Sequence, residues 1–395
     1  MNISFKSFSF LLITCFLTNG LQGQLLKDAQ QSVGAVGPDI VQTAVPFLTI
    51  APDSRAGGMG DLGVATTPDI ASMHWNPAKY AFIQDKEGVE ISYIPWLRNL
   101  VPDINLAYLA GFYKLDQRQT ISASLLYFSL GQVIFKDAGN NDMGQFNPNE
   151  FSIDAAYSRL LADNLSGGMA FRFIYSDFGK AYVQSVGETQ AGISFAADVS
   201  VYYRKPIEIQ SKEAKLSFGL NISNMGSKIS YTQAEAKEFI PTNLRLGSAL
   251  TINADKYNSF TFALDLNKLL VPTPPIYDST GTHILLGMDP NVSVPTGMIH
   301  SFYDAPGGFK EELQEIQWSV GVEYWYYNQF ALRTGYFHES PDQGNRQYYE
   351  IGVGVKLNVL SIDFAYLVPS SGNISPLANT MRFTLCYNLG PPAKR

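Results

Sequence analysis

A two-residue alternation of apolar and polar side chains constrains this sequence more than any other feature. It recurs in segment after segment from Val89 onward, and in one segment the apolar positions are Met169, Phe171, Phe173 and Tyr175. Successive side chains of a strand point to opposite faces, so this period predicts strands with one apolar face. Each segment is long enough to cross a bilayer as a tilted strand, which takes roughly 9–11 residues.

Composition narrows the environment of these strands. Charged residues make up 16% of the chain and aromatic residues 13%, whereas a soluble domain carries about 25% charged residues. The mean hydropathy is −0.03, so apolar and polar residues alternate instead of forming blocks. After residue 23 no run of about 18 apolar residues occurs, so no transmembrane helix is expected. This combination is typical of a transmembrane β-barrel.

The spacing of the segments predicts a single all-β unit over residues 88–390, a 14-stranded antiparallel transmembrane β-barrel. Tight turns are expected at 116–118, 162–164 and 254–256, and long connections at 132–149, 225–241 and 268–314. Short periplasmic turns and longer outer loops alternate in such barrels. We therefore expect 268–314 to be a large extracellular loop and the chain to end on the periplasmic side.

The N-terminal residues predict export and an internal plug. Residues 1–23 fit a signal peptide, with Lys6 before an apolar core and Gly23 near the cleavage point. Residues 24–43 are expected to form a periplasmic N-terminal segment. Residues 44–87 lack the strand period and are rich in Gly, Ala, Asp and Pro. That segment is too large to dangle, so we expect a hatch that plugs the lumen.

Three glycines in this predicted hatch match a nucleotide-binding pattern. Gly58, Gly60 and Gly63 have the spacing G-x-G-x-x-G, which binds a pyrophosphate only between a strand and a helix. Neither element is evident here, and Pro68 would interrupt a following helix. The favoured interpretation is a set of tight turns, because glycine supplies positive φ where a plug must fold compactly.

Several other classes of function find little support in the residues. No run of basic residues occurs, so nucleic acid is not an expected partner. Paired cysteines and closely spaced histidines are missing from the sequence, so no metal and no cofactor is expected. His338 stands beside Glu339 and Ser340, but adjacent strand residues point to opposite faces, so they cannot form one triad. No catalytic residue is predicted.

A resemblance to a known family rests on three stretches. DSRAGGMGDLGVA at 53–65, HWNPA at 74–78 and YIPWL at 93–97 resemble the hatch and first strand of FadL-like outer-membrane barrels. Within that family the chain is most similar to the shuttle proteins of type IX secretion in Bacteroidetes. The hatch motif residues are Gly58, Gly60, Asp61, Gly63, Trp75, Asn76 and Pro77.

The resemblance implies a role without catalysis in the lipid of the outer membrane. Such a barrel would dock beside a large outer-membrane translocon barrel and bind the C-terminal signal domain of secreted cargo. It would then deliver the cargo to a surface sortase (attachment) complex. Two alternatives remain open: a FadL-type channel for hydrophobic compounds, and a lipopolysaccharide deacylase that would use His338.

Partner binding is expected on the loop 268–314. Its first part places apolar residues beyond the membrane, namely Leu269, Leu270, Val271, Pro274, Pro275, Ile276 and Tyr277. Exposed apolar patches of this kind mark interaction sites. The alternative is that the loop folds over the barrel mouth and buries these groups itself.

Charged residues on the inward phase of the strands allow two interpretations. They are Asp154, Arg172, Asp198, Arg245, Asp265, Glu323, Arg333, Glu350 and Lys356. They could line a substrate path. A structural ion network is the favoured interpretation, because unpaired buried charges are costly.

Overall fold

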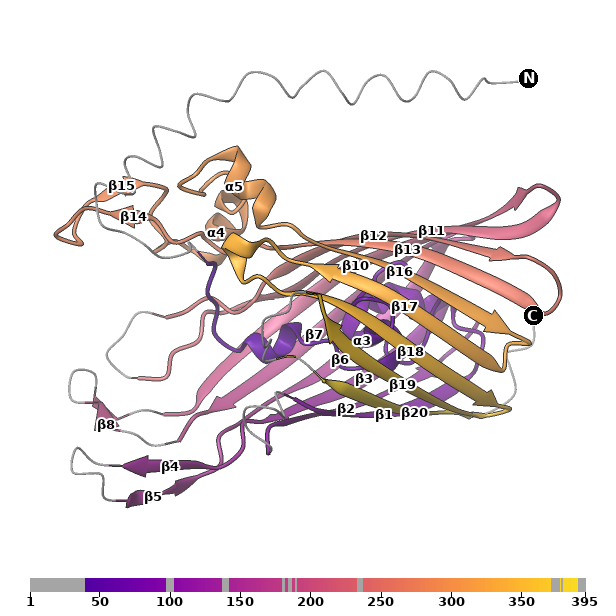
Figure 1. The fold of residues 1–395 in the computed structure, drawn as a ribbon, viewed down its shortest axis with the longest axis horizontal. Helices are drawn as coiled ribbons and strands as arrows, with labels where there is room; N and C mark the ends of the chain where they lie inside the picture. Colours follow the sequence, from indigo (N-terminus) through magenta and orange to yellow (C-terminus); the bar gives the residue numbers. More distant parts are fainter. Residues whose placement is uncertain are drawn as a thin grey trace.

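The computed structural model describes residues 40–389, apart from gaps at 97–102, 137–141, 180–181, 184–186, 189, 233–236, 371–376 and 378. Fourteen strands form a closed barrel in which every neighbouring pair is antiparallel (Figure 1). The first strand, β1, closes the barrel against the last, β20, from the pair Glu87 and Leu389 to the pair Tyr93 and Phe383. The predicted 14-stranded antiparallel β-barrel is confirmed. The predicted signal peptide, 1–23, lies outside the described residues.

The barrel strands follow one another in chain order, and the predicted tight turns and long connections fall between them to within a few residues. The strands are β1 (Glu87–Pro95), β2 (Asn105–Lys114), β3 (Gln119–Ser129), β6 (Asn149–Ala162), β7 (Leu165–Asp177), β10 (Gly192–Ile209), β11 (Lys212–Gly226), β12 (Asn243–Asn253), β13 (Asn258–Leu269), β16 (Gln317–Tyr326), β17 (Phe330–His338), β18 (Gln347–Leu357), β19 (Leu360–Pro369) and β20 (Met381–Leu389).

The predicted alternation separates the two faces of the wall. In β7, Met169 and Phe171 point outward and are 65% and 57% exposed, whereas Arg172 points inward and is buried. In β1 the outward residue Ile91 is exposed and the inward residue Glu90 is buried. The outer wall is thus an apolar belt that fits lipid. Among the described residues, no helix has both the length and the apolar character that crossing a membrane requires.

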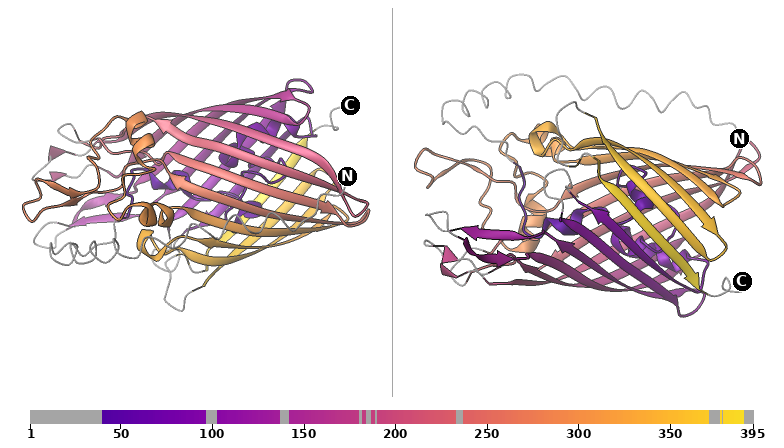
Figure 2. Two further views of the ribbon diagram at one scale, coloured as in Figure 1. Left: turned by 90° about the horizontal axis from the view of Figure 1, so that it is seen from above. Right: turned by 60° about the horizontal axis from the view of Figure 1, so that its bottom comes forward.

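The two ends of the barrel differ, as the loop pattern predicted. One end carries tight hairpins and the end of β20, and the other carries the long connections (Figures 1 and 2). The long connections contain the remaining elements, β4 (Val133–Lys136), β5 (Asp142–Phe146), β8 (Tyr182–Val183), β9 (Gly187–Glu188), β14 (Ile276–Tyr277), β15 (Ile284–Leu286), α4 (Val294–His300), α5 (Phe309–Gln314) and η3 (Pro341–Gln343).

Residues 44–83, here called the inner segment, lie within the barrel (indigo in Figure 1). They form η1 (Pro46–Thr49), α2 (Ser54–Gly57), α3 (Ser72–Trp75) and η2 (Pro77–Phe82). Strand glycines allow their backbone to approach the wall. A Cβ added at Gly335 would lie 2.0 Å from the carbonyl carbon of Met59, and one at Gly219 would lie 2.1 Å from the carbonyl oxygen of Val64. Glycine in a strand marks this kind of close approach.

The chain enters the barrel from the end that carries the long connections. The backbone N–H of Ala44 donates to the carbonyl oxygen of Phe239, in the long connection between β11 and β12, at 2.9 Å. Residues 40–43 line a cavity at that end together with Glu315 and Glu339. Two of the expectations therefore conflict for residues 40–43: if the long connections are outer, these four residues are not periplasmic. Residues 24–39 lie outside the described part.

Candidate functional site

Hydrogen bonds of buried side chains hold several residues of the predicted hatch in place. Asp53 caps α2, with its Oδ2 accepting from the N–H of Ala56 at 2.8 Å and its Oδ1 from Nε1 of Trp75 at 2.7 Å. Asn76 donates to the carbonyl oxygens of Val64 and Val201, each at 3.0 Å. Because Val201 belongs to β10, Asn76 ties the inner segment to the barrel wall. Pro77 begins η2 directly after Asn76.

The glycine pattern fits tight turns. Gly60 and Asp61 have φ of 86° and 56°, the left-handed region that glycine adopts without strain. A Cβ at Gly63 would lie 2.5 Å from the ring of Trp75, and one at Gly58 would lie 2.9 Å from Gly352 of β18. These glycines therefore allow close packing. The helix beside them, α2, comes before the pattern and has only four residues, whereas a nucleotide-binding pattern opens a helix that follows it.

Most of the inward charges form three buried ion clusters. In the first cluster, Arg172 pairs with Asp154 (2.5 Å) and Asp198 (3.2 Å). In the second, Arg333 pairs with Glu323 (2.7 Å) and Asp363 (2.5 Å), and Arg55 pairs with the same Glu323 and with Asp69 (both 2.8 Å). In the third, Arg382 pairs with Asp61 (3.0 Å) and Glu350. Two of the three clusters contain a residue of the inner segment. The structural ion network is therefore the interpretation that these residues support.

Three of the predicted inward charges stand outside these clusters. Asp265 accepts the backbone N–H groups of Gly63 and Val64 at 2.8 and 3.0 Å, so its partners are uncharged. Among the described residues, neither Arg245 nor Lys356 has a carboxylate within ion-pair distance. Lys356 lines a cavity toward the tight-turn end, whereas Arg245 is buried.

The seven loop residues predicted to bind a partner are mostly packed into the loop itself. Leu270, Val271 and Ile276 are buried, and so is Pro275. Leu269 and Pro274 are half-buried, and Tyr277 is exposed. The first part of the loop thus folds as the self-packing alternative described. This arrangement leaves Tyr277 alone of the seven as an open apolar contact.

The second part of this loop, residues 294–316, has its carboxylates inside and its large apolar groups outside; we call it the cap. Lys268 Nζ pairs with Glu312 at 2.9 Å and also with Glu315. Thr273 Oγ1 donates to Glu315 at 2.6 Å, and Asp304 accepts from the Thr273 N–H at 3.2 Å. Burial raises the pKa of Glu315 and of Asp304 above the usual carboxyl range. A helix pair in a globular protein normally buries its apolar side instead.

The outward side of the cap is apolar. Its large exposed residues are Ile299, Phe302, Tyr303, Phe309 and Leu313, between 48% and 75% accessible. Ile299, Phe302 and Tyr303 have the spacing i, i+3, i+4, and Phe309 and Leu313 the spacing i, i+4. Sequence reasoning missed them because it searched for apolar runs; a search at helical period would have found them. We call these five residues the cap face.

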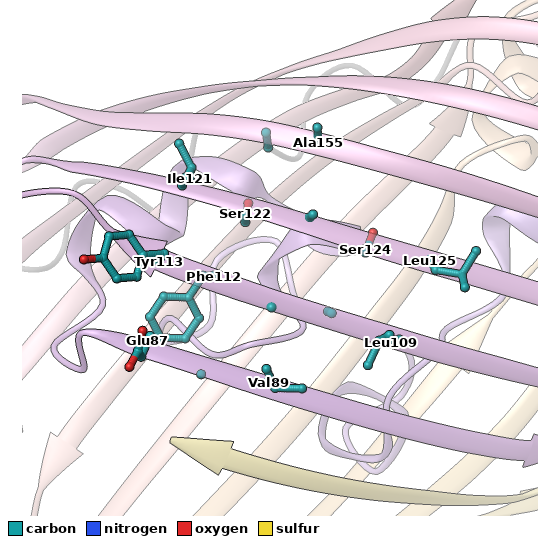
Figure 3. Close-up of a pocket in the computed structure, with 15 residues that line it drawn as sticks. Glu87, Val89, Leu109, Phe112, Tyr113, Ile121, Ser122, Ser124, Leu125 and Ala155 are labelled. Atoms are coloured by element: carbon teal, nitrogen blue, oxygen red, sulfur yellow. The ribbon is translucent and has the colours of Figure 1, made fainter. Parts of the chain in front are cut away.

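A groove crosses the outer wall on strands β1, β2, β3 and β6 (Figure 3). Its floor contains small outward residues that stand opposite one another in register, Gly111 to Ala123 and Ala123 to Ala155. Leu109 and Leu125 rise beside it, and the cavity measures about 820 Å³. The groove belongs to the apolar belt and fits membrane lipid.

His338 lies at the long-connection end of β17. Its ring stacks on Trp318 with 4.9 Å between the centroids, and Nδ1 lies 3.4 Å from the hydroxyl of Tyr336. These partners are aromatic residues of the kind that gather at the membrane interface. Glu339 instead pairs with Arg346 at 2.7 Å.

The closed antiparallel barrel with its apolar outer belt and internal N-terminal segment defines a transmembrane β-barrel of the outer-membrane type. The family model described as "Type IX secretion system protein PorV" matches residues 35–276, more than half of the chain. The chain belongs to this family of type IX secretion proteins, which confirms the resemblance to type IX barrels. The family and the fold are those of a secretion and transport barrel. No curated protein sequence matches the chain.

Several solved structures resemble it at low identity. The toluene transporter TbuX of Ralstonia pickettii shares 10% identity over 87% of this chain and 98% of its own, with a TM-score of 0.44. The toluene transporter TodX of Pseudomonas putida shares 11% identity over 84% of this chain and 95% of its own, with a TM-score of 0.48. A FadL homologue of Pseudomonas aeruginosa shares 10% identity over 88% of this chain and 99% of its own, with a TM-score of 0.42. The transport of toluene remains a property of those proteins.

Proposed function

We propose that this barrel is the cargo shuttle of a type IX secretion system. It docks at the large translocon barrel, holds the C-terminal signal domain of an exported protein, and passes it to the surface sortase complex. Membership of the family supports a role in this system. The observation that carries the finer proposal is the cap face, because it offers a partner an apolar surface beyond the barrel wall.

The inverted polarity of the cap argues for a partner. Leaving Phe302 and Phe309 in water forgoes about 1.5–3 kcal/mol for each side chain that could be buried. The cap instead buries Glu312 and Glu315 against Lys268. The cap therefore buries ion pairs and exposes aromatic rings, so it gains stability when a partner surface covers those rings.

A channel for hydrophobic compounds is less well supported. The interior cavities measure about 240, 80 and 470 Å³, and each is bordered by charged residues, among them Glu90, Asp363, Arg245 and Glu339. Ligand sites for apolar molecules are lined mainly by apolar side chains. The inner segment also fills the space between these cavities with buried residues such as Met59 and Leu62.

An affinity pull-down tests the shuttle role. The tagged barrel is recovered from detergent-solubilised outer membranes, and its companions are identified by mass spectrometry. We expect a giant barrel and proteins that share a C-terminal β-domain. The triple variant Ile299→Ser, Phe302→Ser, Phe309→Ser should lose one or both classes of partner. The apolar residues Tyr326 and Tyr327 are exposed at the tight-turn end, so Tyr326→Ser, Tyr327→Ser is the matched control.

The outcomes separate the parts of the proposal. Loss of the cargo domains alone assigns the cap face to cargo, and loss of the giant barrel assigns it to docking. Full recovery of all partners with the triple variant would remove the cap face from the site. If the native barrel is recovered without any such partner, the shuttle role itself is wrong.

A further inference from the structure

Arg245 of β12 is a buried cation with unusual neighbours. Arg172 and Arg333 each stand in register opposite a carboxylate, Asp154 and Glu323 respectively. Arg245 stands between two asparagines, Asn221 on β11 and Asn267 on β13. Its guanidinium donates to the carbonyl oxygen of His74 at 3.0 Å and lies 4.8 Å above the ring of Trp75. These contacts hold the group in place but supply no anionic charge.

A small polar cavity of about 80 Å³ borders Arg245. Asn267, which is 8% exposed, also lines it, and its Oδ1 has no hydrogen-bond partner among the described residues. Asn243, Trp75 and Trp96 complete this side of the cavity. A buried cation and a free amide beside one cavity are expensive to leave unsatisfied. Together they provide donors for an anion and an acceptor for a proton on the same molecule.

The other charged groups at this cavity already have partners. Arg346 binds Glu339 through two hydrogen bonds of 2.7 Å. Asp61 pairs with Arg382 at 3.0 Å and accepts the hydroxyl of Tyr348 at 2.6 Å. Arg245 is therefore the charged group at this cavity without an ion pair among the described residues. Asp265 and Asp198 act on it electrostatically, but neither is within ion-pair distance of it or lines the cavity.

A larger cavity of about 470 Å³ leads from the barrel mouth toward Arg245. The two cavities share four lining residues, Thr49, Leu269, Gln317 and Arg346. The carboxylates at the mouth have cationic partners: Glu339 pairs with Arg346, and Glu315 shares Lys268 with Glu312. An anion arriving from the long-connection end thus meets paired charges and not bare acids.

We propose that the inner cavity binds a carboxylate that carries an N–H or O–H group nearby: Arg245 supplies the positive charge, and Asn267 Oδ1 accepts a hydrogen bond from that N–H or O–H. Arginine presents a planar pair of donors that matches a carboxylate. The carboxylate comes either from a small free acid or from the C-terminus of a chain whose last residues occupy the outer cavity. The site is independent of the proposed shuttle role, because none of its residues belongs to the cap face.

Calorimetric titration of the full chain in detergent at neutral pH, in buffers free of carboxylates, tests the site. The probes are acetate against acetamide, and triglycine against triglycine amide. Acetate should bind and acetamide should not. Arg245→Gln should weaken binding by about tenfold or more, since a hydrogen bond to a charged group is lost. Arg245→Lys should weaken it less. Lys356→Gln removes an inward cation at another cavity and should leave affinity unchanged.

A second variant covers the case in which Arg245→Gln does not fold. Asn267→Ala keeps the charge but removes the acceptor for a ligand N–H, so it should weaken triglycine binding several-fold and leave acetate binding unchanged. If triglycine binds in addition to acetate and its amide does not, the site accepts a chain terminus. If acetate alone binds, the site serves a small free acid. Equal heats from acetate and acetamide, or equal losses from Arg245→Gln and Lys356→Gln, would overturn the proposal.

Discussion

Arg55 of the inner segment and Glu323 of β16 form a two-point ion pair. Nε of Arg55 donates to Oε2 of Glu323 at 2.9 Å, and Nη2 donates to Oε1 at 2.8 Å. The same Glu323 accepts from Nε of Arg333 on the neighbouring strand at 2.7 Å. The fork geometry makes this the strong class of charged hydrogen bond. The pair therefore fixes the rotation of the inner segment relative to the wall.

Arg55→Ala should loosen the inner segment without opening the barrel. Removing one partner of a buried pair costs about 3–5 kcal/mol when the other charge is left alone. Because Glu323 keeps Arg333, the lower end of that range is expected. Urea titration of the detergent-solubilised barrel measures the loss. Arg118→Ala, in the exposed turn after β2, is the control and should change stability by less than about 0.5 kcal/mol. Equal midpoints for the two variants would contradict the assignment.

Gly335→Ala tests the close approach of the inner segment to β17. The added methyl would lie 2.0 Å from the carbonyl carbon of Met59, so the inner segment must shift. We expect faster amide exchange at residues 56–64 and a loss of at least about 1–3 kcal/mol, the usual range for overpacking. Gly111→Ala adds the same methyl on the outer face, where the nearest atom is 3.3 Å away. Exchange rates that are unchanged by Gly335→Ala would show that the contact is dispensable.

The barrel was predictable because its signal is local. A two-residue period sets the face of each side chain within its own strand, so Arg172 could be placed inward and Phe171 outward from the sequence alone. Loop length then ordered the ends. The register between strands is not local, and it decides that Arg172 meets Asp154 whereas Arg245 meets Asn267. The sequence therefore identified the inward charges but not which of them lack an ion pair.

The cap also depends on contacts between distant residues, which the sequence pattern does not show. An apolar run suggested exposure for Leu270 and Val271, yet these residues are buried, and Phe302 and Phe309 are exposed instead. The side of α5 that faces inward depends on Lys268, which lies 44 residues before Glu312 in the chain. The helical period separates an apolar side from a polar side, but it does not show which side faces the loop interior. An ion pair across a loop of that length has no sequence signature.

Asn76→Ala should disconnect the turn at HWNPA. The side chain caps η2 by accepting the N–H of Ala78 at 3.0 Å and donates to Val64 and Val201. Loss of a cap costs about 1 kcal/mol, and two orphaned carbonyl oxygens add about as much again each. Protease sensitivity of the inner segment should rise. Thr49→Ala removes one exposed side-chain bond to Pro46 and serves as the control. Equal sensitivity of both variants would refute the role of Asn76.

Proton binding should tighten the cap. Burial raises the pKa of Asp304 and of Glu315, so each carboxyl binds its proton more firmly in the folded cap than in the unfolded chain. Their stabilising contribution is complete below the ordinary carboxyl pKa of about 4 and is lost as pH rises through the higher folded values. Amide exchange in α5, corrected for its intrinsic pH dependence, should therefore slow as pH falls from neutral toward the ordinary carboxyl pKa. Asp304→Asn keeps an oxygen that can accept from the Thr273 N–H and should flatten this response. Exchange that instead speeds up on acidification would mean that the ion pairs of Lys268 outweigh the cost of burying the carboxylates.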